Sequence, residues 1–285
     1  MDRGSEVGLM RSPQPPVGAQ RTVEGQGAKS AAQWLRRFDA RSDRVVDDAL
    51  EQIRDVGFCV VDNLLPAATV ARIRTVQGQL LRAERSDNLQ PSGHQRILHL
   101  LVKDALFAEL LCHPVALAIW RRQLGQDMLC STMTGNSLWP GCTEQYWHAD
   151  YPYWTFPQPY PTYPLSGQVI WMIDGFTSAN GGTAGIPYSH RKGSLPKMGR
   201  RWAHDGVVMT GDAGSAVFAD GAWWHTSRPN RTRRIRHAVI VSYIRGYCVT
   251  QEDMLLQLSA MADPSEELKL LLGAKRYVPT RGFPY

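Results

Sequence analysis

The chain has 285 residues, of which 43% are apolar, so it can bury a full hydrophobic core, and one large domain is the first expectation. The formal net charge is +6, but the basic residues form no long tract, and no RNA-binding box, zinc finger or basic helix is visible. These features argue against a nucleic-acid partner. The five cysteines are scattered without a C-x-x-C pair, which argues against a disulfide framework or a zinc ribbon. No signal peptide or bilayer-length apolar run is apparent, so a cytoplasmic protein without a membrane partner is expected.

The first part of the chain divides into a polar tail and a mainly helical segment. Residues 1–30 are rich in Gly, Pro, Gln and charge, which predicts a disordered N-terminal tail. Apolar residues at three-to-four spacing then predict a helical part over 31–126. Its expected elements are helices over 31–56, after Pro66 and over 98–124, with a buried strand over 58–61.

After Gln126 the pattern changes to short apolar runs separated by Gly, Pro and Asn turns. Six or more short strands of this kind indicate an antiparallel β body. We therefore predict a mainly β protein with flanking helices, a double-stranded β-helix (a cupin-like jelly roll), whose core spans 127–250. The remaining residues, 251–285, are expected to carry a C-terminal helix near 264–272. The expected strands cover 128–134, 168–174, 183–187, 206–209, 215–219 and 235–243.

An H-x-D motif formed by His148, Ala149 and Asp150 is followed about 75 residues later by His225. Two imidazoles and one carboxylate can hold one face of an Fe(II) ion and leave the opposite positions open for O₂ and a second small molecule. On a strand, residues i and i+2 point to the same face, so we expect His148 and Asp150 to reach one ion. A bare H-x-D is common by chance, and the specificity comes from the whole pattern.

Arg236 lies eleven residues beyond the third candidate ligand. A guanidinium fork can grip a carboxylate with two charge-assisted hydrogen bonds, so this position suits a dicarboxylate co-substrate. Its neighbours Arg233 and Arg234 are expected to remain on the surface, because charge runs usually form a solvated face.

These motifs resemble those of the phytanoyl-CoA hydroxylase-like family of Fe(II)/2-oxoglutarate dioxygenases, and the resemblance covers the chain from about Ala49 to Tyr243. The matching segments are residues 148–150, 180–190 and 211–236. The family's second segment normally ends in Pro-Gly-Ser-His, whereas Tyr188 replaces that glycine here. This departure leaves the metal assignment intact.

The resemblance implies Fe(II), 2-oxoglutarate and O₂ as cofactor and co-substrates. It also implies that His148, Asp150 and His225 are the catalytic metal ligands. Ser227 is implied to bind the distal carboxylate of 2-oxoglutarate together with Arg236. Two further cofactor contacts, which depend on gap placement, are implied for Asn136 and Trp154.

The carboxylate of Asp150 separates two branches of this chemistry. Related halogenases carry a small residue at that position, so its presence favours hydroxylation or another oxidation. The length and the aromatic, proline-rich segment over 151–164 also resemble a dioxygenase of aminoglycoside biosynthesis, which turns an amine-bearing sugar carbon into a ketone. A cationic aminoglycoside is therefore one expected substrate, and Glu144 is a candidate to hold its ammonium groups.

The segment over 151–164 contains five prolines and six aromatic residues and begins beside the expected metal site. Either a packed surface loop or a substrate lid fits this composition, and the lid is slightly favoured. Tyr151 and Tyr153 are accordingly candidate substrate contacts.

Three alternatives remain open at this point. The first is hydroxylation of an amino acid, a carrier-bound substrate or an acyl-CoA. The second is a cupin-like metal protein that is not an oxygenase, such as an isomerase or a lyase. The third is a catalytically silent binding module that kept the barrel. The oligomeric state, including a homo-oligomer, is not determined by the sequence.

Overall fold

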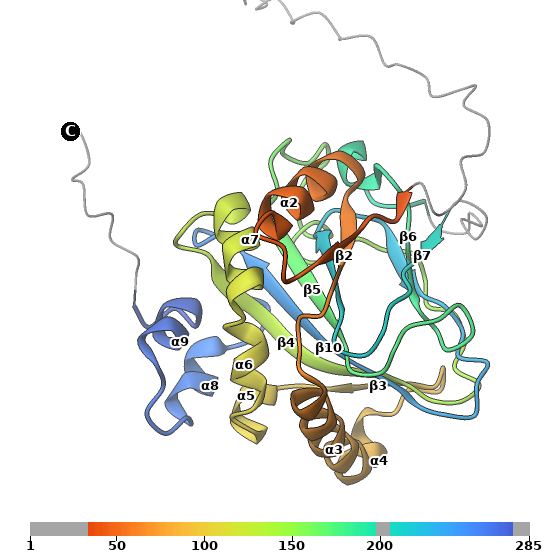
Figure 1. Ribbon diagram of the computed structural model, residues 1–285. Coiled ribbons are helices and arrows are strands. Elements are labelled where there is room, and N and C mark those ends of the chain that lie inside the picture. The colour runs from red at the N-terminus through yellow and green to blue at the C-terminus, as the bar shows by residue number, and fades with distance from the viewer. Residues whose placement is uncertain (1–33, 198–205, 276–285) are drawn as a thin grey trace, which may run out of the picture. The chain divides into compact units, whose positions relative to one another are not determined.

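The computed structural model describes residues 34–197 and 206–275 (Figure 1). A seven-stranded sheet has the order β1-β2-β8-β5-β10-β4-β3, and a three-stranded sheet has the order β7-β6-β9. The expected tail over 1–30 lies outside the described residues. The larger sheet comprises β1 (Arg37–Asp39), β2 (Phe58–Asp62), β3 (His94–Ile97), β4 (Leu129–Leu138), β5 (Ser166–Met172), β8 (Ala216–Asp220) and β10 (Arg236–Ile244). The smaller sheet comprises β6 (Thr183–Gly185), β7 (Val207–Val208) and β9 (His225–Ser227).

The strands pair antiparallel throughout, apart from the parallel pair β1–β2. Helices flank this β body, as the sequence predicted, and the fold is the double-stranded β-helix, or jelly roll. The helices are α2 (Val45–Val56), α3 (Ala67–Ala83), α4 (Arg85–Asn88), α5 (Leu100–Lys103), α6 (Phe107–Leu111), α7 (Pro114–Leu124), α8 (Met254–Ser259) and α9 (Glu266–Leu271). None of the helices in the described ranges is long and apolar enough to cross a bilayer.

Local sequence signals set several helix boundaries. Gly57 takes a left-handed conformation with φ of 105°, and its N–H donates to the carbonyl of Ile53, which ends α2 at Val56, the last residue of the range expected to be helical. Pro114 occupies the first turn of α7, where its missing N–H leaves no intrahelical hydrogen bond unmade.

Of the two helices expected over 31–56, the second is α2, whereas the first is wrong. Residues Arg37–Asp39 form β1 instead, because their backbone pairs with β2 and Arg37 forms an ion pair with Asp62 on that strand. Tertiary pairing therefore overrides the helical spacing of the local apolar residues. The helical block over 98–124 is three helices, and the C-terminal segment holds α8 as well as α9.

The larger sheet has two different faces, and the alternation along β10 illustrates them. Val239, Val241 and Tyr243 are fully buried in the core that the helices cover. Ile240 and Ser242, which alternate with them, line a cavity on the opposite face. One face therefore provides stability while the other is available for a site.

Helix α7 packs on the covered face through Trp120, which is fully buried. The indole lies over Gly167 on β5, where an added Cβ would come within 2.1 Å of a ring carbon of Trp120. The glycine therefore allows the helix to approach the sheet closely.

A buried carboxyl group organises the turn that follows β8. Asp220 is 5% exposed, and its side chain accepts a hydrogen bond from the backbone N–H of Ala222 at 2.9 Å. Burial raises the pKa of Asp220 to about 7. This turn leads into β9, so its shape determines the position of His225, the first residue of that strand.

We expect Gly167→Ala to lower the free energy of unfolding by about 1–3 kcal/mol, because the new methyl group overlaps the Trp120 ring. Urea denaturation followed by fluorescence measures this change. Gly78→Ala in α3 is the matched control: only a flexible arginine end lies near its Cβ, so a gain of about 0.5–1 kcal/mol is expected. Equal effects of the two substitutions would contradict the packing argument.

Asp220→Asn should change how stability depends on pH. The folded-state pKa of Asp220 is raised, so its protonated form favours the folded state. This contribution to the free energy of unfolding is fully present at low pH and is lost as the pH rises from about 4 through 7. The asparagine cannot ionise but keeps an oxygen that can accept from Ala222. The stability difference between the variant and wild type should therefore shift in favour of the variant between pH 5 and pH 8. Urea midpoints of both proteins at the two pH values measure this shift. A pH-independent difference would show that the carboxyl group is not desolvated.

Candidate metal centre

Three side chains that are distant in sequence converge on one point. His148, Asp150 and His225 each offer one ligand atom, and these atoms lie within 4.8 Å of one another. An oxygen of Asp150 is 3.6 Å from Nε2 of His148 and 3.7 Å from Nε2 of His225. The two imidazole rings are 4.2 Å apart between centroids. The arrangement could hold a single metal ion.

A pair of backbone hydrogen bonds produces this convergence. The N–H of His148 donates to the carbonyl of His225 at 3.1 Å, and the N–H of His225 donates back at 2.9 Å. The N–H of Asp150 donates to the carbonyl of Gly221 at 3.0 Å. The H-x-D segment was expected to lie on a strand, but it forms only an isolated bridge to β9. The side chains therefore reach one point through the bridge rather than through strand alternation alone.

Both imidazoles are oriented through their other ring nitrogen. Nδ1 of His148 lies 3.0 Å from the carbonyl of Tyr146, and Nδ1 of His225 lies 3.2 Å from the carbonyl of Trp223. A carbonyl can only accept, so each Nδ1 carries the proton and donates. Each Nε2 lone pair is then free to bind a metal, which is the usual arrangement around metal-binding histidines.

His225 is kept neutral by its surroundings. Burial lowers the pKa of His225 to about 4, and the nearby His148 and Arg96 contribute in the same direction. The indole of Trp223 stacks on the ring at 4.6 Å between centroids with an angle of 13°. A neutral imidazole is the form that ligates metals, so the site needs no proton release from His225 near neutral pH.

The three side chains line a cavity of about 290 Å³ between the two sheets. Most of the residues that line it carry polar side chains, and they include residues of β3, β4, β5, β6, β9, β10 and the segment after β10. Besides the three candidate ligands, the lining residues include Arg96, Thr132, Thr134, Asn136, Gln145, Tyr151, Trp154, Gln168, Ile170, Ser227, Ile240, Ser242, Gln251 and Glu252.

Arg236 is 2% exposed and is held by neutral groups. It donates to the carbonyl of Gly181 at 2.8 Å, and its guanidinium lies over the Phe176 ring, 4.3 Å from the centroid. Burial lowers the pKa of Arg236 to about 10. Its Nε is buried without a hydrogen-bond partner, and no carboxylate of the described ranges forms an ion pair with it. The nearby Asp174 already binds Arg74 at 2.7 Å.

The other predicted co-substrate contacts lie in the cavity wall. Ser227 and Asn136 are 8% and 4% exposed and line the cavity, and Oδ1 of Asn136 is buried without a partner. Trp154 also lines it but is 53% exposed, so it lies at the rim. Arg236 itself is not among the lining residues, although it occupies the same face of β10 as Ile240.

The predicted substrate contacts separate into two groups. Tyr151 lines the cavity and donates its hydroxyl hydrogen bond to the carbonyl of Val249 at 2.9 Å. Tyr153 does not line it: its ring is buried against Tyr160, and its hydroxyl accepts from the N–H of Leu165 at 2.8 Å. Glu144 also lies outside the lining, in an ion pair with Arg228 at 2.7 Å. The segment over 151–164 is thus partly packed and only partly at the cavity.

Sequence reasoning missed several polar residues of the cavity. Gln168 carried a detectable signal, because it is a polar residue within an apolar strand whose neighbours are buried. Arg96 and Glu252 carried none, because the first lies on a strand within the part expected to be mainly helical and the second lies in the segment after β10.

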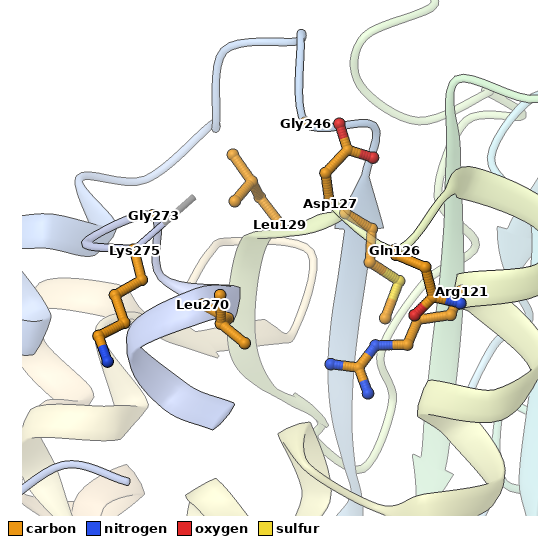
Figure 2. A pocket seen from close by; sticks show the side chains of 9 residues that line it. Arg121, Gln126, Asp127, Leu129, Gly246, Leu270, Gly273 and Lys275 are labelled. Carbon is orange, nitrogen blue, oxygen red and sulfur yellow. The ribbon is translucent and has the colours of Figure 1, made fainter. Parts of the chain in front are cut away.

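A separate hollow of about 280 Å³ lies between the α7–β4 turn and the segment after α9 (Figure 2). Figure 2 shows Asp127 on one side and Leu270 and Lys275 on the other. Arg121, which also lines it, is paired with Glu267. No predicted site residue lines this hollow.

The donor set fits iron, and the buried cation fits its keto-acid co-substrate. Two neutral imidazoles and one carboxylate are the ligands typical of non-haem Fe(II) sites that keep open positions. Arg236, a buried guanidinium with an unpartnered Nε, is suited to receive a carboxylate. The unpartnered Oδ1 of Asn136 is a further polar atom available in the same region.

Comparisons with known proteins agree with this geometry. The phytanoyl-CoA dioxygenase (PhyH) family matches residues 53–238. An uncharacterised protein of Mycobacterium tuberculosis is 26% identical over 242 residues, covering 78% of this chain and 86% of that protein. The dioxygenase af480 of Aspergillus fumigatus is 30% identical over 149 residues, covering 52% of this chain and 47% of that protein.

Solved structures share the fold at low identity. The non-haem α-ketoglutarate-dependent epimerase SnoN from nogalamycin biosynthesis is 17% identical, with a TM-score of 0.59 over 72% of this chain and 82% of its own. HygX from Streptomyces hygroscopicus, solved with nickel, 2-oxoglutarate and hygromycin B, is 16% identical, with a TM-score of 0.59 over 71% and 88%.

The family match spans well over half of the chain and includes the H-x-D motif, His225 and Arg236. It confirms the resemblance that the sequence motifs indicated. The chain therefore belongs to the phytanoyl-CoA dioxygenase (PhyH) family and is a 2-oxoglutarate-dependent non-haem iron dioxygenase that uses Fe(II), 2-oxoglutarate and O₂.

Proposed function

We propose that His148, Asp150 and His225 hold the catalytic Fe(II) and that Arg236, with Ser227, holds the distal carboxylate of 2-oxoglutarate. The observation that carries this assignment is the meeting of the three ligand atoms within 4.8 Å at the wall of a cavity. The buried and carboxylate-free guanidinium on the same face of β10 supports the co-substrate site. Asn136 is the proposed additional polar contact.

When bound, iron with 2-oxoglutarate and O₂ supplies an oxidation that converts a substrate C–H bond to C–OH and releases succinate and CO₂. The protein's own residues bind and orient the reactants. The backbone carbonyls of Tyr146 and Trp223 hold the two imidazoles in the ligating tautomer. Ile170 and Ile240 supply an apolar section of wall that limits water near the reacting carbon. Asp150 keeps a carboxylate in the donor set, which favours hydroxylation over halogenation.

For the substrate we propose a cationic aminoglycoside, oxidised at an amine-bearing carbon. Hydroxylation there gives a carbinolamine, which eliminates ammonia and leaves a ketone, as in the conversion of kanamycin B to 2'-oxokanamycin. The balanced reaction consumes the amine, O₂ and 2-oxoglutarate and yields the ketone, ammonia, succinate and CO₂. The polar side chains among the lining residues, such as Thr132, Gln168 and Glu252, support a substrate with hydroxyl and amine groups. The likeness in fold to HygX, solved with hygromycin B, agrees with this choice.

A second candidate is hydroxylation of an amino acid, a carrier-bound substrate or an acyl-CoA. Arg96 favours it, because this arginine lines the cavity and forms no ion pair within the described ranges, so it could receive a carboxylate or phosphate. A substrate of this class would release succinate without ammonia.

The metal and co-substrate assignment is tested by anaerobic absorbance titration with Fe(II) and 2-oxoglutarate. Wild type should develop the visible charge-transfer band of the iron-chelated keto-acid, and His148→Ala and Asp150→Ala should lose it. Arg236→Met should raise the dissociation constant of 2-oxoglutarate by about 10- to 100-fold, because a charged hydrogen-bonding pair is lost. Arg122→Met, at an exposed ion pair on α7, is the matched control. A band that persists in both ligand variants would overturn the assignment.

The substrate proposal is tested by product stoichiometry. With kanamycin B, the enzyme should release succinate and ammonia in equal amounts and form one ketone per turnover, measured by mass spectrometry and coupled assays. Amino acids and acyl thioesters are tested in parallel. Succinate release that depends on one of those substrates, without ammonia, would select the second candidate function instead.

A further inference from the structure

On the face of the larger sheet that carries the cavity, residues of three neighbouring strands form successive rows. On β10 the residues of this face are Arg236, Ala238, Ile240 and Ser242, in that order. Ile240 lies beside Thr134 on β4 and Ile170 on β5, and these three form a middle row. The succession leads from the buried guanidinium through a row of two isoleucines and one threonine toward Ser242, a path of about 20 Å at the usual strand rise.

The row at the far end from Arg236 is entirely polar. Ser242 is the cross-strand neighbour of Thr132 on one side and of Gln168 on the other. All three line the cavity. Gln168 is 2% exposed, and its Nε2 is buried without a hydrogen-bond partner among the described residues. A buried amide N–H that lacks an acceptor is costly, so this group points to a ligand oxygen or nitrogen that accepts from it.

A carboxylate closes this end of the cavity. The side chain of Glu252 is 9% exposed and lines the cavity. Its two oxygens accept hydrogen bonds from the hydroxyl of Thr132 and, at 2.7 Å, from the amide of Gln257. The backbone N–H of Glu252 donates to the carbonyl of Ser131 at 2.9 Å, which fixes the residue beside β4.

Within the described ranges, no lysine or arginine balances this carboxylate. No lysine or arginine of the described ranges forms an ion pair with Glu252. The nearest basic group is Nδ1 of His99, 3.6 Å away on a side chain that is 51% exposed. A largely buried carboxylate that is held only by neutral donors gains from a cationic partner, because such a pair recovers part of the desolvation cost.

We propose that Glu252, Gln168 and the hydroxyl groups of Thr132 and Ser242 form a subsite for a substrate ammonium group that carries neighbouring oxygen atoms. Glu252 accepts from the ammonium group, and the Gln168 amide donates to an adjacent hydroxyl or ether oxygen. This inference rests on the proposed function and assigns the specificity-determining acid to Glu252 instead of Glu144, which Arg228 already neutralises.

The subsite also explains how the cavity separates its two charged ligands. Arg236 lies at one end of the β10 face and Glu252 beside the other, with the row of Thr134, Ile240 and Ile170 between them. An anionic co-substrate and a cationic substrate are each attracted to their own end. Charge complementarity of this kind supports specificity, because the reversed placement would bring like charges together.

The test measures binding of kanamycin B by calorimetry to the full-length protein, both metal-free and loaded anaerobically with Fe(II) and 2-oxoglutarate. L-lysine and per-N-acetylated kanamycin B are the comparison probes. Glu252→Gln should raise the dissociation constant of kanamycin B by about 10- to 100-fold and leave that of 2-oxoglutarate within twofold. Glu109→Gln, the same change at an exposed residue of α6, should leave both unchanged.

A parallel test uses the wild-type protein alone. Acetylation removes the positive charges of kanamycin B, so the acetylated probe should bind to wild type at least tenfold more weakly than kanamycin B. Tighter binding of kanamycin B than of L-lysine supports recognition of an oxygen-bearing amine. Binding of kanamycin B that is equal in wild type and Glu252→Gln, or absent in both forms of wild type, overturns the subsite. A wild type that binds the amine but lacks the keto-acid charge-transfer band refutes the proposed function and leaves the subsite standing.

Discussion

The antiparallel bridge between His148 and His225 is the contact on which the candidate site depends. Its two backbone hydrogen bonds, at 3.1 and 2.9 Å, join a loop to the first residue of β9. The convergence of the candidate ligands is therefore fixed by backbone contacts. Because backbone carbonyls also hold both Nδ1 atoms, the Nε2 lone pairs are oriented without help from a carboxylate.

Burial of polar groups is the second constraint on the cavity. His225 is kept neutral by desolvation, and Arg236 is kept in an environment of neutral partners. A neutral imidazole is suited to a metal ion, and a guanidinium with neutral partners is suited to a carboxylate. The same reasoning applies to Gln168, whose unpartnered amide lies in the polar row at the other end of the cavity. The helix-covered face of the larger sheet, with its packed apolar core, supplies the stability that these polar groups do not.

Prediction from the sequence succeeded where local pattern and tertiary structure agree. Short apolar runs between turn residues correctly predicted the strands around residues 168–174 and 235–243. The three-to-four spacing of apolar residues correctly predicted the end of α2 before Gly57. Prediction failed at Arg37–Asp39, where pairing with β2 outweighs helical spacing, and at the H-x-D segment, which is a bridge rather than a strand. Periodicity reports only neighbours along the chain, so it cannot detect an interaction that comes from a distant strand.

The sequence alone indicated the family and its reaction class, because the order and spacing of His148, Asp150, His225 and Arg236 are carried in the chain itself, and the family match confirmed both. Tertiary structure decided which other side chains share the cavity. Glu144, a plausible acid from its position beside the motif, is paired with Arg228, whereas Glu252 is more than one hundred residues away in sequence and lies at the cavity. The reason is physical: whether a charged side chain is available to a ligand depends on its partners and burial, which only the folded chain establishes.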